Sequence, residues 1–168
     1  MTDSLLAILD KLEVLPRDSD ALTIDTGFAK AADALAFMLG GNARVTFRSK
    51  KTGDRFTYRI AVCDGKPDLF FVAVLTGPDN TSSFQYLGTI RRGFAGDRYA
   101  HGVKSRIGAD APSARGFAWV WAQLQGGGIP SAVEIWHEGR CGRCARPLTV
   151  PESIRTGFGS ECAGKLGF

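Results

Sequence analysis

Three cysteines near the C-terminal end of the sequence have the residue type and the spacing that bind a metal ion. Cys141 and Cys144 are separated by two residues, and Cys162 follows the glycine-rich stretch from Gly157 to Gly159. Two thiolates at this spacing can reach one ion from a single tight turn, and a third can close on them from the start of a helix. The sequence therefore predicts a structural site with zinc (Zn) as its cofactor.

A tetrahedral zinc ion needs a fourth ligand, which the three cysteines do not supply. His137 lies four residues before Cys141 and is close enough to fold back onto the ion, so we predict that it completes the ligand set. The sequence leaves open His101, Cys63, a carboxylate such as Glu161, or a water molecule in the same position.

The spacing of the cysteines also predicts how the site is built. A Cys-x-x-Cys turn is followed by a segment with two prolines and then by a cysteine that enters a last helix at about residues 160–166. This arrangement resembles a shortened treble clef, although a usual treble clef takes two ligands from that helix and only Cys162 is available here. We expect residues 131–168 to form a zinc-binding, treble-clef-like module and residues 1–130 a separate domain.

The cysteine-containing stretch also resembles a known family. From Cys141 to Cys162 it reads CGRCARPLTVPESIRTGFGSEC. It is similar to the small cysteine motif of the DUF6011 family, which is found in phage and prophage proteins and is appended to some larger nucleic-acid enzymes. The sequence departs from that motif at Ser160, where the family more often has proline. The resemblance implies a zinc-binding module in a phage or bacterial setting, and it implies nothing about residues 1–130.

The rest of the chain supplies the elements that must position this module. Apolar residues recur at helical spacing over residues 4–15 and again over 28–39, where Asp25-Thr26 is a candidate helix cap. From Ala43 to about Val103 the apolar period changes to two, which is typical of an antiparallel meander of about five strands. A further helix over about 110–125 is expected to cover the sheet. These patterns predict an α+β fold in which helices flank the sheet.

Basic residues are concentrated in the middle of the chain. The net charge is +4, but residues 41–110 carry twelve Lys or Arg against six Asp or Glu, whereas residues 1–40 carry three against seven. Alternation in the first two strands places several of these cations on one sheet face, and others lie in the loop 91–97 and around the cysteine turn. The predicted nucleic-acid-binding residues are Arg44, Arg48, Lys50, Arg55, Arg59, Arg91, Arg92, Arg140, Arg143 and Arg146.

These patterns favour a zinc-containing protein that binds DNA or RNA. The alternative is a phage-encoded factor that inhibits or redirects a host protein complex, such as a defence system, with zinc purely structural. We expect no enzymatic activity, because the nucleophile-elbow, phosphate-loop and zinc-protease motifs are absent. Cysteine clustering, the lack of a basic secretory region and the lack of a long apolar run predict a cytoplasmic protein without a membrane partner.

Overall fold

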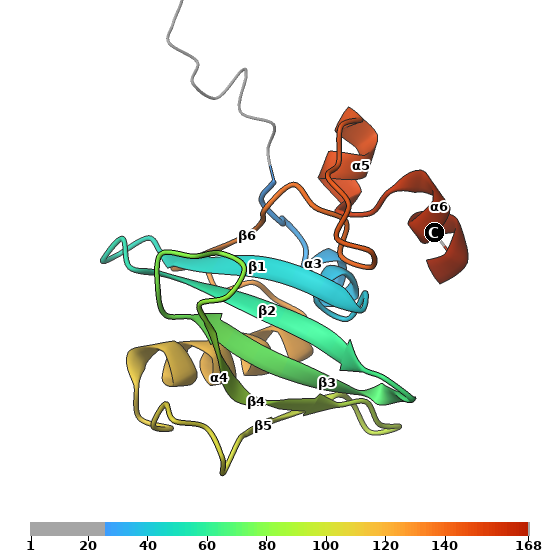
Figure 1. Ribbon diagram of the computed structural model, residues 1–168. Coiled ribbons are helices and arrows are strands. Elements are labelled where there is room, and N and C mark those ends of the chain that lie inside the picture. The colour runs from blue at the N-terminus through green and yellow to red at the C-terminus, as the bar shows by residue number, and fades with distance from the viewer. Residues whose placement is uncertain (1–25, 168) are drawn as a thin grey trace, which may run out of the picture.

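A six-stranded antiparallel sheet lies at the centre of the computed structural model, which describes residues 26–167 (Figure 1). Its strands are β1 (Asn42–Ser49), β2 (Arg55–Cys63), β3 (Lys66–Leu75), β4 (Phe84–Arg91), β5 (Arg98–His101) and β6 (Val133–His137). The helices are α3 (Ala31–Met38), α4 (Pro112–Gln125), α5 (Pro151–Thr156) and α6 (Ser160–Leu166). The predicted α+β class is confirmed, while the helix predicted over residues 4–15 lies outside the described residues.

The strands are ordered β5-β4-β3-β2-β1-β6, so the first five form the predicted meander and β6 adds to its free edge. The prediction of about five strands missed this pairing, because β6 follows β1 only after the whole meander and α4. Ile135 of β6 lies opposite Phe47 of β1, and both side chains are buried. The division of the chain at residue 130 stays a prediction. Strand β6, which lies after this position, joins the sheet and then leads directly into the cysteine turn.

The helix predicted to begin at Phe28 begins instead at Ala31. Gly27 forms a β-bridge with Trp136, and the N–H of Phe28 donates to the carbonyl oxygen of Ile135 at 2.8 Å. These bonds hold the chain extended beside β6, so α3 begins three residues later than predicted. Lys30 occupies the N-cap position, and Asp25 of the predicted cap lies outside the described residues.

Helices α3 and α4 cover one face of the sheet and enclose the core with it (Figure 1). Phe117 of α4 stacks on Phe47 with ring centroids 5.7 Å apart and lies 4.9 Å from the ring of Tyr58. The Tyr58 hydroxyl donates to the carbonyl oxygen of Ser113 at 2.7 Å, which ties the first turn of α4 to β2. The alternation in β1 and β2 therefore gives one apolar face, and α4 covers it as predicted.

The opposite face of the sheet carries no helix among the described elements (Figure 1). The hairpin between β3 and β4 curls over part of this face, because the ring of Phe84 lies 5.6 Å from the guanidinium carbon of Arg44, three strands away. We refer to this surface as the open face. Within residues 26–167, no helix combines the length and the apolar character that a bilayer crossing requires.

Candidate metal centre and basic sheet face

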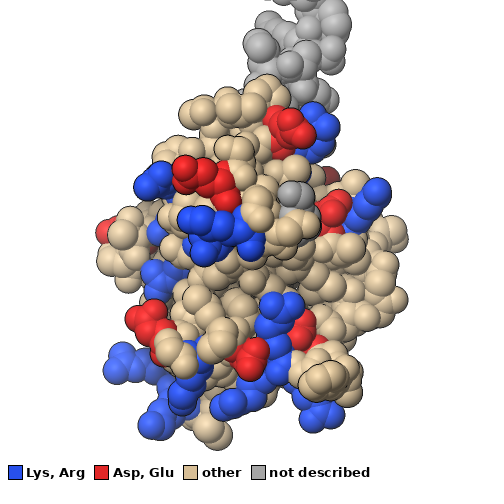
Figure 2. All heavy atoms as spheres, turned by 90° about the vertical axis from the view of Figure 1, so that its right-hand side faces the viewer, with Lys and Arg blue, Asp and Glu red and all other residues tan. Residues whose placement is uncertain are grey.

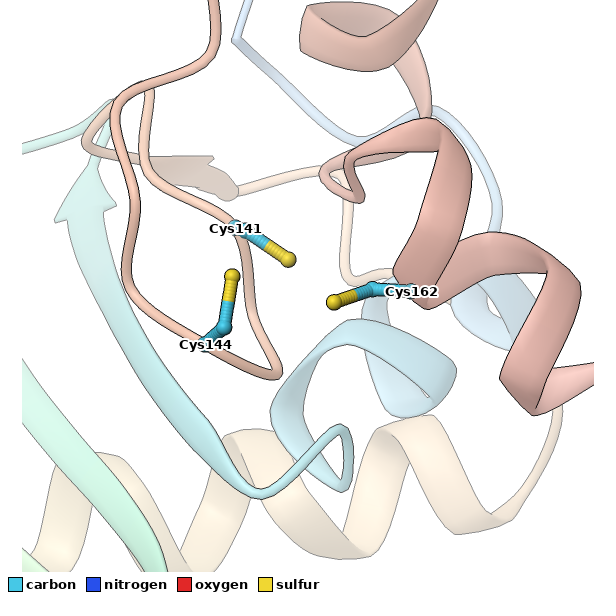
Figure 3. A group of neighbouring side chains, drawn as sticks. All are labelled: Cys141, Cys144 and Cys162. Atoms are coloured by element: carbon cyan, nitrogen blue, oxygen red, sulfur yellow. The ribbon is translucent and has the colours of Figure 1, made fainter.

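The three cysteines predicted to bind metal converge on one space. The Sγ atoms of Cys141, Cys144 and Cys162 all lie within 4.8 Å of one another. Figure 3 shows the first two sulfurs extending from the turn after β6 and the third from α6, all three directed toward a common point. Cys141 and Cys162 are buried, whereas Cys144 is exposed. This group could hold a metal ion between a tight turn and a helix, as the spacing predicted.

Backbone hydrogen bonds close the turn that presents the first two sulfurs. The N–H of Cys141 donates to the carbonyl oxygen of Arg146 at 2.9 Å, and the N–H of Ala145 donates back to the carbonyl oxygen of Cys141 at 2.8 Å. Ala145 has a φ of 62°, a left-handed conformation that is uncommon for a residue with a side chain. The turn is thus a defined structure in which both sulfurs emerge on one side.

Glycines allow this turn to pack closely on α3. A Cβ atom on Gly142 would lie 2.8 Å from Cδ2 of Phe37, and one on Gly157 would lie 2.5 Å from the same atom. The N–H of Gly142 also donates to the carbonyl oxygen of Gly157 at 2.9 Å, which joins the cysteine turn to the end of α5. The ring of Phe37 therefore positions both segments that carry the cysteines, a role that sequence reasoning did not assign to it.

The electrostatic environment prepares one thiol for metal binding. Burial by itself raises the pKa of Cys141, but the backbone N–H groups of Cys144, Gly159 and Arg143 donate to its sulfur, so the pKa falls to about 7. The pKa of Cys162 is raised, first by burial and also by the neighbouring sulfurs, while the Arg143 guanidinium at 3.9 Å partly offsets this. Metals bind thiolates, and the lowered pKa favours the thiolate form of Cys141.

The structure does not bring His137 to the three sulfurs. Its Nδ1 accepts the N–H of Gly139 at 3.0 Å, which places the proton on Nε2, and Nε2 lies 2.6 Å from the carbonyl oxygen of Ile154. The ring is buried and packs against the rings of Phe28 and Phe37, with centroids 5.5 and 5.2 Å away. In this geometry His137 connects β6 to α5 and is not the predicted fourth ligand.

The alternative fourth ligands are also outside the cluster. Among the described residues, the metal-ligating group contains the three cysteines alone. His101 lies on β5 with its Nε2 2.9 Å from the carbonyl oxygen of Ile107, and Cys63 ends β2. Glu161 is exposed on α6 but does not join the group.

The cysteine cluster lies in a segment that comparison with protein families identifies. Residues 136–167 match the model of DUF6011, a family of unknown function. This confirms the resemblance seen in the sequence, and the matched part, called the DUF6011 segment below, contains all three cysteines. Comparison with curated proteins and with solved structures found no match to the chain.

Four of the predicted nucleic-acid-binding residues share the open face. Arg44 lies opposite Arg59 and Arg48 opposite Arg55 in the register of β1 and β2. Lys50 follows the end of β1 and is exposed. The predicted basic patch of the first hairpin therefore exists as a set of cross-strand arginine pairs.

Acidic and aromatic side chains are interleaved with these arginines. Arg44 lies 3.8 Å from Glu138 of the DUF6011 segment, and Arg48 lies 3.6 Å from Glu134 of β6. The Phe84 ring also faces Arg59, with its centroid 5.1 Å from the guanidinium carbon. Two arginines of the face are thus partly neutralised, while Arg55 forms no ion pair with any described residue.

The remaining predicted residues lie away from these arginine pairs. Arg91 and Arg92 are at the end of β4, where Arg92 lies 3.8 Å from Asp97. Arg140, Arg143 and Arg146 surround the cysteine turn, and Arg140 donates to the carbonyl oxygen of Ala145 at 3.2 Å. Figure 2, which views the side of the molecule at the right of Figure 1, shows Lys and Arg interspersed with Asp and Glu. The structure thus gathers the arginines of the first hairpin, and the others are dispersed.

Proposed function

We propose that this protein binds nucleic acid through its open face and holds a structural Zn²⁺ in the DUF6011 segment. The observation that carries the nucleic-acid proposal is the presence of Arg44, Arg48, Arg55 and Arg59 on one sheet face that no described helix covers. Arginine binds phosphate through planar, bidentate hydrogen bonds, and cations in such a row can follow the backbone of a nucleic acid.

The ion pairs on this face do not oppose the proposal. Both join partly exposed side chains, with 21% and 26% exposure for Arg44 and Glu138. Exposed ion pairs typically contribute about 0–1 kcal/mol, so a phosphate can replace a carboxylate at small cost. Arg55 is exposed and needs no such exchange.

The chemistry of the donor set supports zinc as the metal. Three thiolates in a reducing environment favour Zn²⁺ over the hard cations Mg²⁺ and Ca²⁺, which prefer oxygen. The sulfurs come from two segments, the turn at residues 141–144 and α6, that otherwise meet through few bonds. Residues 1–25 contain neither cysteine nor histidine. An oxygen ligand, from water or a carboxylate, therefore completes the tetrahedron in this proposal.

Fluorescence anisotropy with labelled single- and double-stranded DNA and RNA tests the nucleic-acid proposal. We expect binding at low salt whose affinity falls steeply as salt rises. Replacing Arg55 and Arg59 by glutamine should weaken binding and reduce the salt slope by about 0.7 for each phosphate of a single strand that the variant no longer neutralises. Arg115→Gln, an exposed change on α4, is the matched control. Absence of binding to every probe would refute the proposal.

A protein-docking role, in which the chain acts as a phage-encoded factor on a host complex, is favoured by a different observation. Phe94 and Val103 are apolar and fully exposed, in the loops before and after β5. Apolar side chains at this exposure are characteristic of contact surfaces when they belong to a larger patch. A stoichiometric protein partner that survives nuclease treatment, and that Phe94→Ser and Val103→Ser abolish, would favour this role over nucleic-acid binding.

A further inference from the structure

The ring of Tyr86 packs against Gly102 at the edge of the open face. Tyr86 lies opposite Ala73 of β3, and its ring centroid is 6.2 Å from that of Phe71 in an edge-on arrangement. A Cβ atom on Gly102 would collide with Cε1, Cζ and the hydroxyl oxygen of Tyr86, so the ring can occupy this position only because residue 102 is glycine. The aromatic pair Phe71 and Tyr86 thus extends the open face beyond the arginines.

A pocket of about 260 Å³ adjoins the Tyr86 ring. It is lined by Gln85, Tyr86, Lys104 and Arg106. The loop that carries the two cations is anchored, because the hydroxyl of Ser105 donates to the carbonyl oxygen of Tyr86 at 2.7 Å and accepts the N–H of Ile107 at 3.1 Å. Lys104 and Arg106 are exposed, and neither forms an ion pair with any described residue.

The chemistry of this pocket matches one unit of a nucleic-acid strand. An aromatic face can stack a base, an amide can hydrogen-bond to a base edge, and two adjacent cations can neutralise a phosphate. The volume is below the roughly 300–1,000 Å³ of a usual small-molecule site, which suits one base of a longer ligand better than a free cofactor. No carboxylate lines the pocket, so its charge is complementary to an anion.

We propose that Tyr86, Lys104 and Arg106 bind one nucleotide of a single-stranded nucleic acid, with the base on the Tyr86 ring and a phosphate between the two cations. Phe71 offers a second stacking surface for the adjacent base. This inference rests on the proposed function and specifies the ligand, because bases in a duplex are stacked on one another and their faces cannot reach the ring. A single strand therefore binds more tightly than a duplex of the same sequence.

The experiment measures anisotropy of labelled single-stranded DNA and RNA and of the matching duplexes with the full-length protein. Stacking contributes roughly 1–3 kcal/mol per base, so Tyr86→Ala should weaken single-strand binding by roughly 5- to 150-fold, whereas Tyr86→Phe should retain it. Replacing both Lys104 and Arg106 by glutamine should reduce the salt slope by about 0.7, because one phosphate is then no longer neutralised. Phe71→Ala removes a side chain that is 43% exposed and serves as a second variant if Tyr86→Ala unfolds the protein.

Trp119→Ala is the matched aromatic control. Trp119 is 48% exposed and belongs to α4, the helix that covers the sheet face opposite the open face. Retained affinity in this variant, with weakened binding in Tyr86→Ala and Phe71→Ala, supports the site. Equal binding of single strand and duplex, with full affinity in Tyr86→Ala and Phe71→Ala, overturns this inference and leaves the open-face proposal standing. Absence of any binding by the unaltered protein overturns both.

Discussion

The imidazole of His137 donates from Nε2 to the carbonyl oxygen of Ile154 at 2.6 Å and thereby joins the last strand of the sheet to α5. Its other nitrogen accepts the N–H of Gly139 in the turn before the cysteines. A single buried side chain thus joins the end of β6 both to the turn before the cysteines and to α5. Because the ring is only 4% exposed, water cannot replace these hydrogen bonds without rearrangement.

His137→Phe should destabilise the fold without removing the metal. The substitution keeps an aromatic ring but leaves the Ile154 carbonyl and the Gly139 N–H without their partner, so we expect the free energy of unfolding to fall by about 2–4 kcal/mol. Urea denaturation followed by circular dichroism measures this decrease, and metal analysis of the folded variant should still find one zinc per chain. A folded variant that has lost its zinc would instead identify His137 as a ligand.

Gly157→Ala should disrupt the packing of the cysteine segments on α3. Gly157 has a φ of 80°, and its added Cβ would lie 2.5 Å from Cδ2 of Phe37, so both backbone strain and collision oppose the change. Gly139→Ala separates the two effects, because Gly139 has a φ of 72° but nothing within 4 Å of its Cβ position. We expect Gly139→Ala to cost about 1–2 kcal/mol and Gly157→Ala clearly more. Equal destabilisation of the two variants in thermal denaturation would contradict the close approach to Phe37.

Buried Tyr58 and partly buried Tyr99 should respond differently to replacement by phenylalanine. The Tyr58 hydroxyl donates to Ser113, so Tyr58→Phe should lower the free energy of unfolding by about 1–2 kcal/mol. The Tyr99 hydroxyl is buried without a hydrogen-bond partner among the described residues, so Tyr99→Phe should leave stability unchanged or raise it. Parallel urea titrations at neutral pH compare the two variants, and a larger decrease in Tyr99→Phe would contradict these assignments.

The same tyrosines should make the protein sensitive to alkaline pH. Burial, aided by the nearby Tyr86, raises the pKa of Tyr99 from 10.0 to about 12, and burial also raises the pKa of Tyr58. Above pH 10 the unfolded chain releases these protons while the folded chain retains them, so stability present below pH 10 is lost as pH rises toward 12. Denaturation midpoints measured across this range should fall less steeply for Tyr99→Phe. An identical slope would show that Tyr99 titrates normally.

Sequence periodicity predicted the parts of the fold that local pattern determines. The alternation around Val45 and Phe47 identified the buried face of β1, and the span of α4 followed from its apolar repeat and the glycines after Gln125. The convergence of Cys141 and Cys144 followed from their spacing, because a two-residue gap confines two sulfurs to one turn. Nucleic-acid binding, the protein partner and the cytoplasmic location stay predictions.

What the sequence did not reveal depends on contacts between distant segments. The pairing of Val133–His137 with β1 and the extended residues 26–28 beside it are set by tertiary hydrogen bonds, which no local period encodes. The role of His137 is also set by tertiary contacts, because its spacing from Cys141 is compatible with a metal ligand and with a structural residue alike. Its position at the end of a paired strand directs its ring toward Phe37 and Ile154 instead.

We propose that zinc bound to Cys141, Cys144 and Cys162 holds the DUF6011 segment together. Inductively coupled plasma mass spectrometry of the purified protein tests it most directly, with Cys162→Ser as the variant and Cys63→Ser as the control outside the cluster. We predict about one zinc per chain in the unaltered protein and in Cys63→Ser, and loss of zinc in Cys162→Ser. Metal-free protein, or zinc that Cys162→Ser retains in full, would contradict this claim.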